Sequence, residues 1–424
     1  MSRVLGLVVE YNPFHYGHLH HLHESIRLIN PDYVVAVMSG NFCQRGEPAI
    51  VNKFARARVA LMNGVDLVLE LPVVYATQDA GGFAIGSVGV LHKSGVVTDM
   101  VFGSESGDID FLRKVANILV NQTPEFQEAF KKQLKLGYSY PNARKYALMD
   151  VLNGEISKLS KSNDILGIEY VKSIIQYESS IEPHVIKRMG ADYNDEQFKG
   201  KFSSASAIRR SIKVGEFEHS KEALPPATYE VLYEEFSKGR GPIFWEDLEF
   251  VIGMFRKLKR EDFEKIYSFN EGLDLRFYEA ARESGDLQRF VELVKAKRFT
   301  YSRIRRAILH VLLDMDKERI EKSNVLGPQY LRVLGFNSKG RELLKQIKKQ
   351  SEVPIISTAS LYKQVLEDAQ KQNMEGKRLW KIDRELFIWQ FERDILASDI
   401  YTFLYPNKSL RSAGMDFEQP IMMT

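Results

Sequence analysis

The sequence predicts an α/β fold: a parallel sheet flanked by helices in the first half of the chain, followed by a mostly helical domain. Short apolar runs alternate with segments of helical spacing in residues 1–221, an arrangement typical of parallel strands joined by right-handed crossovers. The Pro225-Pro226 pair then breaks this pattern, and the spacing beyond it is mostly helical. We therefore expect two domains, covering residues 1–221 and 222–424.

The expected sheet is read from five short strand-like runs, the first of which is a β-branched apolar run. The five runs are Val4–Val9, Tyr33–Met38, Leu67–Leu71, Met100–Gly103 and His184–Lys187. Apolar residues at helical spacing predict helices between them at His20–Leu28, Lys53–Asn63, Gln78–Leu91, Ile109–Leu136 and Ile165–Tyr177. The same spacing predicts later helices at Asp247–Leu258, Asp286–Val294, Ser302–Leu313, Gly340–Lys349 and Leu379–Tyr401. Ligands of parallel sheets bind beyond the carboxyl ends of the strands, so the loops there should form one site.

The composition is ordinary for a globular protein, with 44% hydrophobic and 27% charged residues. No apolar run reaches the length of a membrane span, and the N-terminus leads into a strand without a basic leader. A lone cysteine, Cys43, excludes an intrachain disulfide and fits a reducing compartment. We expect a cytoplasmic protein with no membrane segment, and we interpret Cys43 as a bystander thiol because no activating group is visible beside it.

The turn between the first strand and the first helix contains His15-x-Gly17-His18, the spacing of the HxGH motif of nucleotidylyl transferases. A glycine there lets a polyphosphate approach the helix start, whose N–H groups and dipole favour negative charge. The two imidazoles would donate to charge developing on the α-phosphate and the leaving pyrophosphate. The alternatives are surface histidines or a metal cluster with His20, His21 and His23, but no cysteine cluster accompanies them, so we expect no metal ligands.

A second phosphate-binding pattern is the serine-rich segment Lys201–Ile212, which reads as a loop that opens a helix. The hydroxyls of Ser203, Ser204 and Ser206 and the N–H groups of a helix start bind phosphate oxygens. Arg209 or Arg210 would add a charge-assisted contact, but not both, since neighbours on a helix point about 100° apart. The segment resembles the Ser/Thr-Ser-x-x-Ile-Arg motif of the same superfamily, and an ordinary helix cap with a basic face is the alternative.

Basic residues concentrate in one stretch of the second half. Residues 291–350 contain fifteen Lys or Arg and six Asp or Glu, a balance of +9, which leaves −6 for the rest of the chain. Aromatic residues lie among them, as in surfaces that follow a phosphate backbone, although a solvated helix face has the same composition. We expect RNA contacts from Lys297, Arg298, Arg305, Arg306, Lys348 and Lys349. Reversing the charges of Arg305, Arg306, Lys348 and Lys349 should weaken RNA binding and spare the nucleotide site.

Several blocks together resemble the bacterial tRNA(Met) cytidine acetate ligase family. They are Val9-Glu10-Tyr11-Asn12-Pro13-Phe14-His15-Tyr16-Gly17-His18, Met38-Ser39-Gly40-Asn41-Phe42-Cys43-Gln44-Arg45-Gly46-Glu47-Pro48-Ala49, Lys53-Phe54-Ala55-Arg56-Ala57 and Phe202-Ser203-Ser204-Ala205-Ser206-Ala207-Ile208-Arg209-Arg210. The resemblance extends along the whole chain, through Arg332-Val333-Leu334-Gly335-Phe336-Asn337. It implies a Rossmann-like nucleotidylyl transferase domain that binds ATP and acetate, and a helical domain that binds elongator tRNA(Met). A KMSKS-type loop is absent, which argues against tRNA charging.

The resemblance implies a two-step reaction. Acetate attacks the α-phosphate of ATP to give acetyl-adenylate and pyrophosphate. The exocyclic amine of the wobble cytidine, C34, then takes the acetyl group to give N4-acetylcytidine and AMP. Mg²⁺ is expected with the triphosphate, held mostly by phosphate oxygens and water. The sequence does not indicate the oligomeric state.

Residue roles follow from these positions. His15, His18 and Lys53 are the candidate catalytic residues, with a surface lysine as the alternative for Lys53. Asn163 would bond adenine or ribose, with helix capping as the alternative. The full set expected at ATP is Leu7, Val8, Val9, Glu10, Tyr11, Asn12, Pro13, Phe14, His15, Tyr16, Gly17, His18, Leu19, His20, Gly103, Asn163, Arg188, Ser203, Ser204, Ser206 and Arg209. Two other functions fit parts of the pattern: a small-molecule adenylyl transferase, and a non-catalytic RNA-binding protein on a relic α/β domain.

Overall fold

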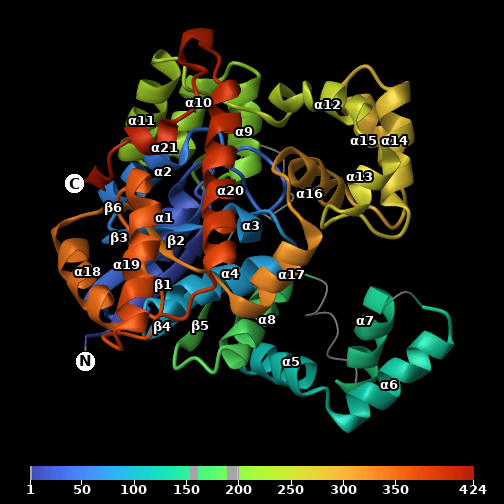
Figure 1. Cartoon of the computed structure of the whole chain (residues 1–424), viewed down its shortest axis with the longest axis horizontal. Helices are drawn as coiled ribbons and strands as arrows, with labels where there is room; N and C mark the ends of the chain where they lie inside the picture. The colour runs from blue at the N-terminus through green and yellow to red at the C-terminus, as the bar shows by residue number, and fades with distance from the viewer. Residues whose placement is uncertain (1, 139, 153–160, 189–197, 199) are drawn as a thin grey trace.

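The computed structural model describes residues 2–138, 140–152, 161–188, 198 and 200–424, and is built around one mainly parallel sheet (Figure 1). Its parallel strands are β1 (Val4–Val9), β2 (Tyr33–Ser39), β3 (Leu67–Leu71), β4 (Asp99–Ser104) and β5 (Glu182–Lys187). Their spatial order is β5-β4-β1-β2-β3. The predicted α/β class is confirmed, and the five predicted strands occur within two residues of their expected bounds.

The helices of the first half occur between these strands as expected, with one correction. They are α1 (Tyr16–Ile29), α2 (Lys53–Met62), α3 (Val73–Ala76), α4 (Ala80–Lys93), α5 (Ile109–Asn121), α6 (Pro124–Lys135), α7 (Tyr140–Val151) and α8 (Ser162–Gln176). The single helix predicted over Ile109–Leu136 is therefore wrong. Gln122 takes a left-handed conformation with φ 44°, and the hydroxyl of Thr123 caps α6, which begins at Pro124.

The second half is mostly helical, as expected. Its longer helices are α11 (Pro226–Ser237), α12 (Val251–Lys257), α14 (Leu273–Glu283), α15 (Leu287–Val294), α16 (Tyr301–Leu312), α17 (Lys317–Leu326), α18 (Ser338–Gln350), α19 (Tyr362–Met374) and α20 (Arg384–Phe403). Its shorter helices include α13 (Arg260–Glu264) and α21 (Met415–Glu418), while α9 (Ala205–Lys213) and α10 (Phe217–Ser220) end the first half. No described helix is long and apolar enough to span a bilayer.

Three strands from this half complete the sheet, which the periodicity did not predict. Strand β6 (Leu331–Phe336) runs antiparallel to β3, and β7 (Ile355–Ile356) and β8 (Met422–Met423) both pair with β6. The two halves of the chain therefore share one sheet. The sequence pattern did not indicate β6, because a charged residue, Arg332, is buried within this strand.

Buried ion pairs compensate that arginine. Arg332 contacts Glu70 of β3 at 3.2 Å and Asp416 of α21 at 3.0 Å. Lys53, at the start of α2, contacts the same two carboxylates at 2.8 and 2.9 Å and is fully buried. Burial raises the pKa of Asp416, but Arg332 and Lys53 more than offset this and hold that pKa below its usual range. The network fastens the C-terminal segment to the centre of the sheet.

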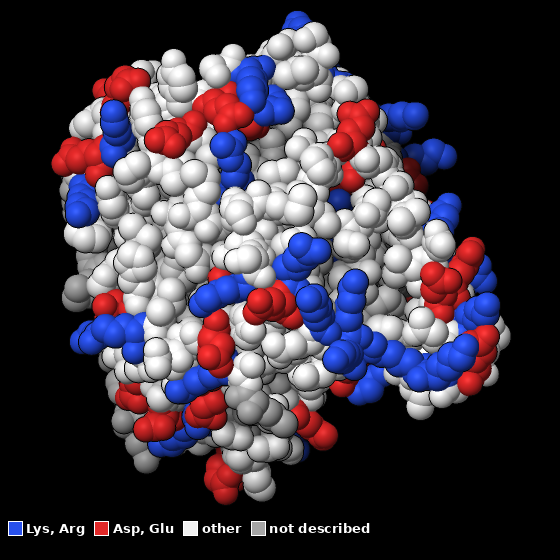
Figure 2. All heavy atoms as spheres, turned by 90° about the vertical axis from the view of Figure 1, so that its left-hand side faces the viewer, with Lys and Arg blue, Asp and Glu red and all other residues white. Residues whose placement is uncertain are grey.

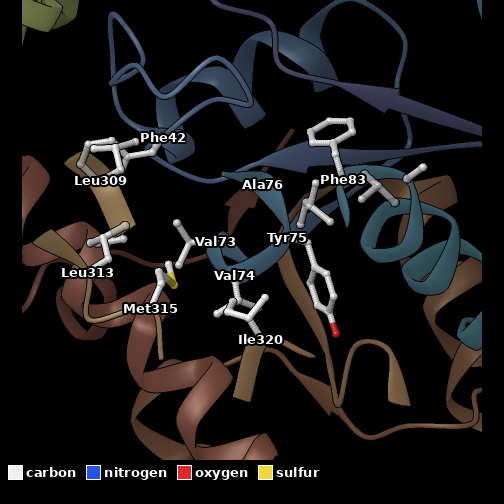
Figure 3. Close-up of a cluster of buried hydrophobic side chains, with 14 of the residues drawn as sticks. Phe42, Val73, Val74, Tyr75, Ala76, Phe83, Leu309, Leu313, Met315 and Ile320 are labelled. Carbon is white, nitrogen blue, oxygen red and sulfur yellow. The ribbon is translucent and has the colours of Figure 1, made fainter. Parts of the chain in front are cut away.

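Helix α16 is anchored to the sheet domain through a shared apolar core (Figure 3). Leu309 and Leu313, at the end of α16, lie with Phe42, which follows β2, and with Val73 of α3. All four side chains are almost completely buried. This close packing holds α16 against the segment that follows β2.

Candidate active site

A cavity of about 450 Å³ opens at the carboxyl ends of the central strands, where the parallel topology places ligands. Most of the residues expected at ATP line it: Val8, Val9, Glu10, Tyr11, Asn12, His15, Gly17, His18, His20, Gly103, Asn163, Arg188, Ser203, Ser204, Ser206 and Arg209. The histidine motif and the serine loop are almost 190 residues apart in the chain, and they meet here.

Six expected residues do not line the cavity. Leu7, Pro13 and Phe14 are buried in the interior, while Tyr16 and Leu19 lie on α1 outside the cavity wall. Lys53 is the important correction, because it was a candidate catalytic residue. Its ammonium group is enclosed by Glu70 and Asp416, so it has a structural role in the sheet and is not a surface lysine either.

The geometry around Gly17 explains the glycine of the motif. His15 precedes α1 as its N-cap, and its Nδ1 accepts a hydrogen bond from the Gly17 N–H at 3.0 Å. A Cβ at residue 17 would lie 2.7 Å from Cε1 and 2.9 Å from Nδ1 of His15. Any side chain at residue 17 would therefore displace the His15 ring, so the ring keeps its position only with glycine there.

His15 and His18 form a pair of neutral donors. Their ring centroids are 3.9 Å apart, and Nδ1 of His18 accepts from the His15 N–H at 3.4 Å. Since both Nδ1 atoms accept, the proton of each neutral ring is on Nε2. Burial, Arg188 and Arg209 lower the pKa of His15 to about 3, and burial and His15 lower that of His18 well below its ordinary value. Both rings are therefore neutral at pH 7, and each has one N–H donor, on Nε2.

Two neighbouring histidines lie at the same cavity. His20 and His21 also line the cavity, and burial lowers the pKa of His21 to about 4. Among the described residues, no group of three or more His, Cys, Asp or Glu side chains is placed to hold a metal ion.

The serine loop presents a capped helix start to the cavity. The hydroxyl of Ser204 accepts from the N–H of Ala207 at 3.1 Å and so caps α9. The hydroxyl oxygens of Ser204 and Ser206 are 3.0 Å apart, and both residues line the cavity. One turn later Arg209 lines the cavity and Arg210 does not, as their positions on a helix require.

The opposite wall comes from the ends of β4 and β5. A Cβ on Gly103 would lie 3.2 Å from Cγ of Arg188, so this glycine leaves room for an arginine that was expected at ATP. Asn163 is not the cap of α8, whose N-cap is Lys161. Its amide instead donates to Glu105 at 2.7 Å, which holds Asn163 at the cavity wall.

Sequence reasoning missed part of the lining. The loop after β2 contributes Cys43, Gln44, Arg45 and Glu47, and apolar lining comes from Phe83, Phe102, Leu166, Tyr170 and Ile186. Residues 43–47 follow a predicted strand, so their place at its carboxyl end was a usable signal. Cys43 is buried, and burial with nearby Glu10 raises its thiol pKa to about 12, which removes the thiolate at neutral pH.

The basic stretch 291–350 divides between two places. Arg305 and Arg306, on α16, are half-buried against the loop after β2: Arg305 pairs with Glu47, and Arg306 donates to the carbonyl of Gln44 at 3.3 Å. Lys348 and Lys349 lie on α18, which covers β2 and β3 on the left in Figure 1. That side of the molecule mixes basic and acidic side chains (Figure 2). Arg305 and Arg306 therefore lie on a different part of the molecule from Lys348 and Lys349.

The chain is similar to known proteins over nearly its whole length. The model of the HIGH nucleotidyl transferase family matches residues 2–416. Proteins named tRNA(Met) cytidine acetate ligase from Fervidobacterium nodosum and Thermotoga maritima are 75% and 50% identical to this chain, over 99% and 98% of it and 99% of each relative. The crystal structure of Thermotoga maritima TmcAL bound with alpha-thio ATP superimposes with a TM-score of 0.93 at 48% identity, covering 99% of both chains. These matches show that the chain belongs to the HIGH nucleotidyl transferases and, within them, to the tRNA(Met) cytidine acetate ligase family.

Proposed function

We propose that this protein activates acetate with ATP and transfers the acetyl group to N4 of the wobble cytidine, C34, of elongator tRNA(Met). The observation that carries the chemistry is the pair of neutral Nε2–H donors, His15 and His18, facing the serine loop and Arg209 across one cavity. The acetate and tRNA parts of the proposal are supported by the names of relatives that match nearly all of the chain.

In the first step, an acetate oxygen attacks the α-phosphorus of ATP and the bond to the bridging oxygen of pyrophosphate breaks. Negative charge grows on the non-bridging oxygens and on the leaving group. His15 and His18 donate to these oxygens, and Arg209 and the start of α9 hold the β- and γ-phosphates. Positioning and electrostatic stabilisation suffice, so no covalent intermediate with the protein is needed.

In the second step, the cytidine amine attacks the carbonyl carbon of acetyl-adenylate, AMP leaves, and the amine loses a proton. Mg²⁺ fits the first step as a companion of the triphosphate, held mostly by phosphate oxygens and water, since the described residues include no preformed ligand group. When bound, it would neutralise charge on the leaving pyrophosphate. A tRNA substrate would place this activity in the cytoplasm.

For the RNA surface we propose the side of the molecule that carries the segment before α16. Lys297 and Arg298 are exposed there, and α16 packs beside the cavity loop. Lys348 and Lys349 are exposed on α18, and they are proposed as distant contacts.

The experiment separates the two half-reactions. Pyrophosphate release with ATP and acetate alone measures adenylation, and acetyl transfer to tRNA(Met) measures the second step. The double change Lys297→Glu and Arg298→Glu should weaken tRNA binding most at low salt and leave pyrophosphate release unchanged. Undiminished tRNA binding would contradict the assigned surface. A small-molecule adenylyl transferase would instead leave AMP attached to its acceptor.

A further inference from the structure

The loop after β2 joins the ATP cavity to α16 through one carboxylate. Glu47 lines the cavity, and its two oxygens are shared between two arginines. Oε2 accepts from Arg209 of the serine-loop helix at 3.2 Å, and Oε1 accepts from Arg305 of α16. Arg305 itself does not line the cavity.

The loop is held rigidly against α16. Its turn is closed by the Cys43 N–H bonding to the Glu47 carbonyl at 2.8 Å. Gly46, at φ 78°, packs so closely that a Cβ would lie 2.5 Å from the backbone nitrogen of Arg306. Phe42, just before the loop, is buried in the cluster that contains Leu309 of α16 (Figure 3). These contacts therefore keep the Glu47 carboxylate close to Arg209 and Arg305.

Arg209 has two anchors in this arrangement. It donates to the carbonyl of Asn12 at 2.7 Å and to Glu47 at 3.2 Å. Its positive charge also helps to lower the pKa of His15. Further N–H donors of the guanidinium remain for phosphate oxygens. A carboxylate beside Arg209 nonetheless competes with a triphosphate for the same cation, and the strength of that competition depends on what else neutralises the carboxylate.

We propose that Arg305 is a positioning residue for ATP: by pairing with Glu47 from outside the cavity, it divides the charge of Glu47 and leaves Arg209 available to the triphosphate. Without Arg305, Glu47 would pair more strongly with Arg209 and would neutralise more of the charge that Arg209 offers to the triphosphate. The position of α16, which carries Arg305, is thereby coupled to the affinity of the protein for ATP. This inference rests on the proposed ATP site, and it differs from the sequence-based expectation that changing the charge of Arg305 spares that site.

The test is ATP affinity, measured by calorimetry on the full-length protein without acetate or tRNA. Arg305→Gln should raise the Kd for ATP roughly tenfold, the worth of one charge-assisted hydrogen bond. Adding Glu47→Gln to that variant should bring the Kd back toward the wild-type value, because the competing carboxylate is gone. Rescue by a second substitution is a result that a merely structural role of Arg305 would not give.

The matched control is Arg240→Gln. Arg240 pairs with Glu235 at 2.6 Å, and its side chain is 30% exposed against 31% for Arg305, but neither residue of that pair lines the cavity. Its Kd for ATP should stay at the wild-type value. An unchanged Kd in folded Arg305→Gln, or no rescue by Glu47→Gln in the folded double variant, would overturn the inference. ATP binding without acetyl transfer would instead count against the proposed function alone.

Discussion

Replacing Gly17 with alanine tests whether the histidine pair is placed as precisely as the structure implies. The new Cβ would lie 2.7 Å from Cε1 of His15, and ordinary contact begins at 3.4 Å, so the ring must move by about 0.7 Å. The move also breaks the bond from the Gly17 N–H to Nδ1 of His15. Misplacement of about 1 Å costs roughly 10² in rate, and loss of one stabilising donor costs roughly 10²–10³. We therefore expect kcat for pyrophosphate release to fall about 100-fold.

Stability should not fall with it, because alanine is favoured over glycine in a helix by about 1 kcal/mol, which offsets local strain. The control is Gly253→Ala on α12, where a Cβ meets nothing within 4 Å. That variant should melt at the same temperature or higher and keep full activity. The assay is pyrophosphate release with saturating ATP and acetate, alongside thermal unfolding. Wild-type kcat in folded Gly17→Ala would refute the proposed role of the His15 ring.

Three further predictions follow from named contacts. His18→Ala should lower kcat for adenylation by roughly 10²–10³ with little change in melting temperature; a folded variant with full kcat would remove His18 from the mechanism. Lys53→Met should cost about 3–5 kcal/mol in unfolding free energy, because it leaves Glu70 and Asp416 with Arg332 as their remaining cation. The folded fraction of Lys53→Met should keep the wild-type KM for acetate, and a selective rise in that KM would restore a catalytic role. Burial lowers the pKa of His310 to about 4, whereas an unfolded histidine titrates near 6.5. The unfolded chain then binds more protons below pH 6.5, so His310 destabilises the fold progressively as the pH falls from 6.5 toward 4. His310→Gln should therefore lose less melting temperature than the wild type over that interval, and parallel profiles would contradict the assignment.

Local patterns were sufficient for the parallel sheet and the histidine turn. Val4–Val9 is an uninterrupted apolar run, Leu67–Leu71 is apolar except for Glu70, and both strands have the predicted bounds. The residues Gln122-Thr123-Pro124 also contain a local signal for the break between α5 and α6. The helical spacing on either side of them nevertheless predicted a single helix.

Features that depend on distant partners could not be read in this way. Arg332 looks unsuited to a buried strand until Glu70 and Asp416 are brought beside it, 262 and 84 residues away in the chain. The same two carboxylates decide that Lys53 is structural. The charge count over residues 291–350 likewise could not show that Arg305 and Arg306 turn toward the cavity loop while Lys348 lies on α18.

The central claim is that one cavity activates acetate with ATP for transfer to a tRNA cytidine. Its most direct test is mass analysis of nucleosides from tRNA(Met) incubated with the protein, ATP and isotopically labelled acetate. We predict labelled N4-acetylcytidine at C34, with AMP and pyrophosphate formed in amounts equal to the acetyl groups transferred, and none of these products with His18→Ala. Adenylyl groups retained on an acceptor, or no labelled nucleoside from a protein that binds both ATP and tRNA, would contradict it.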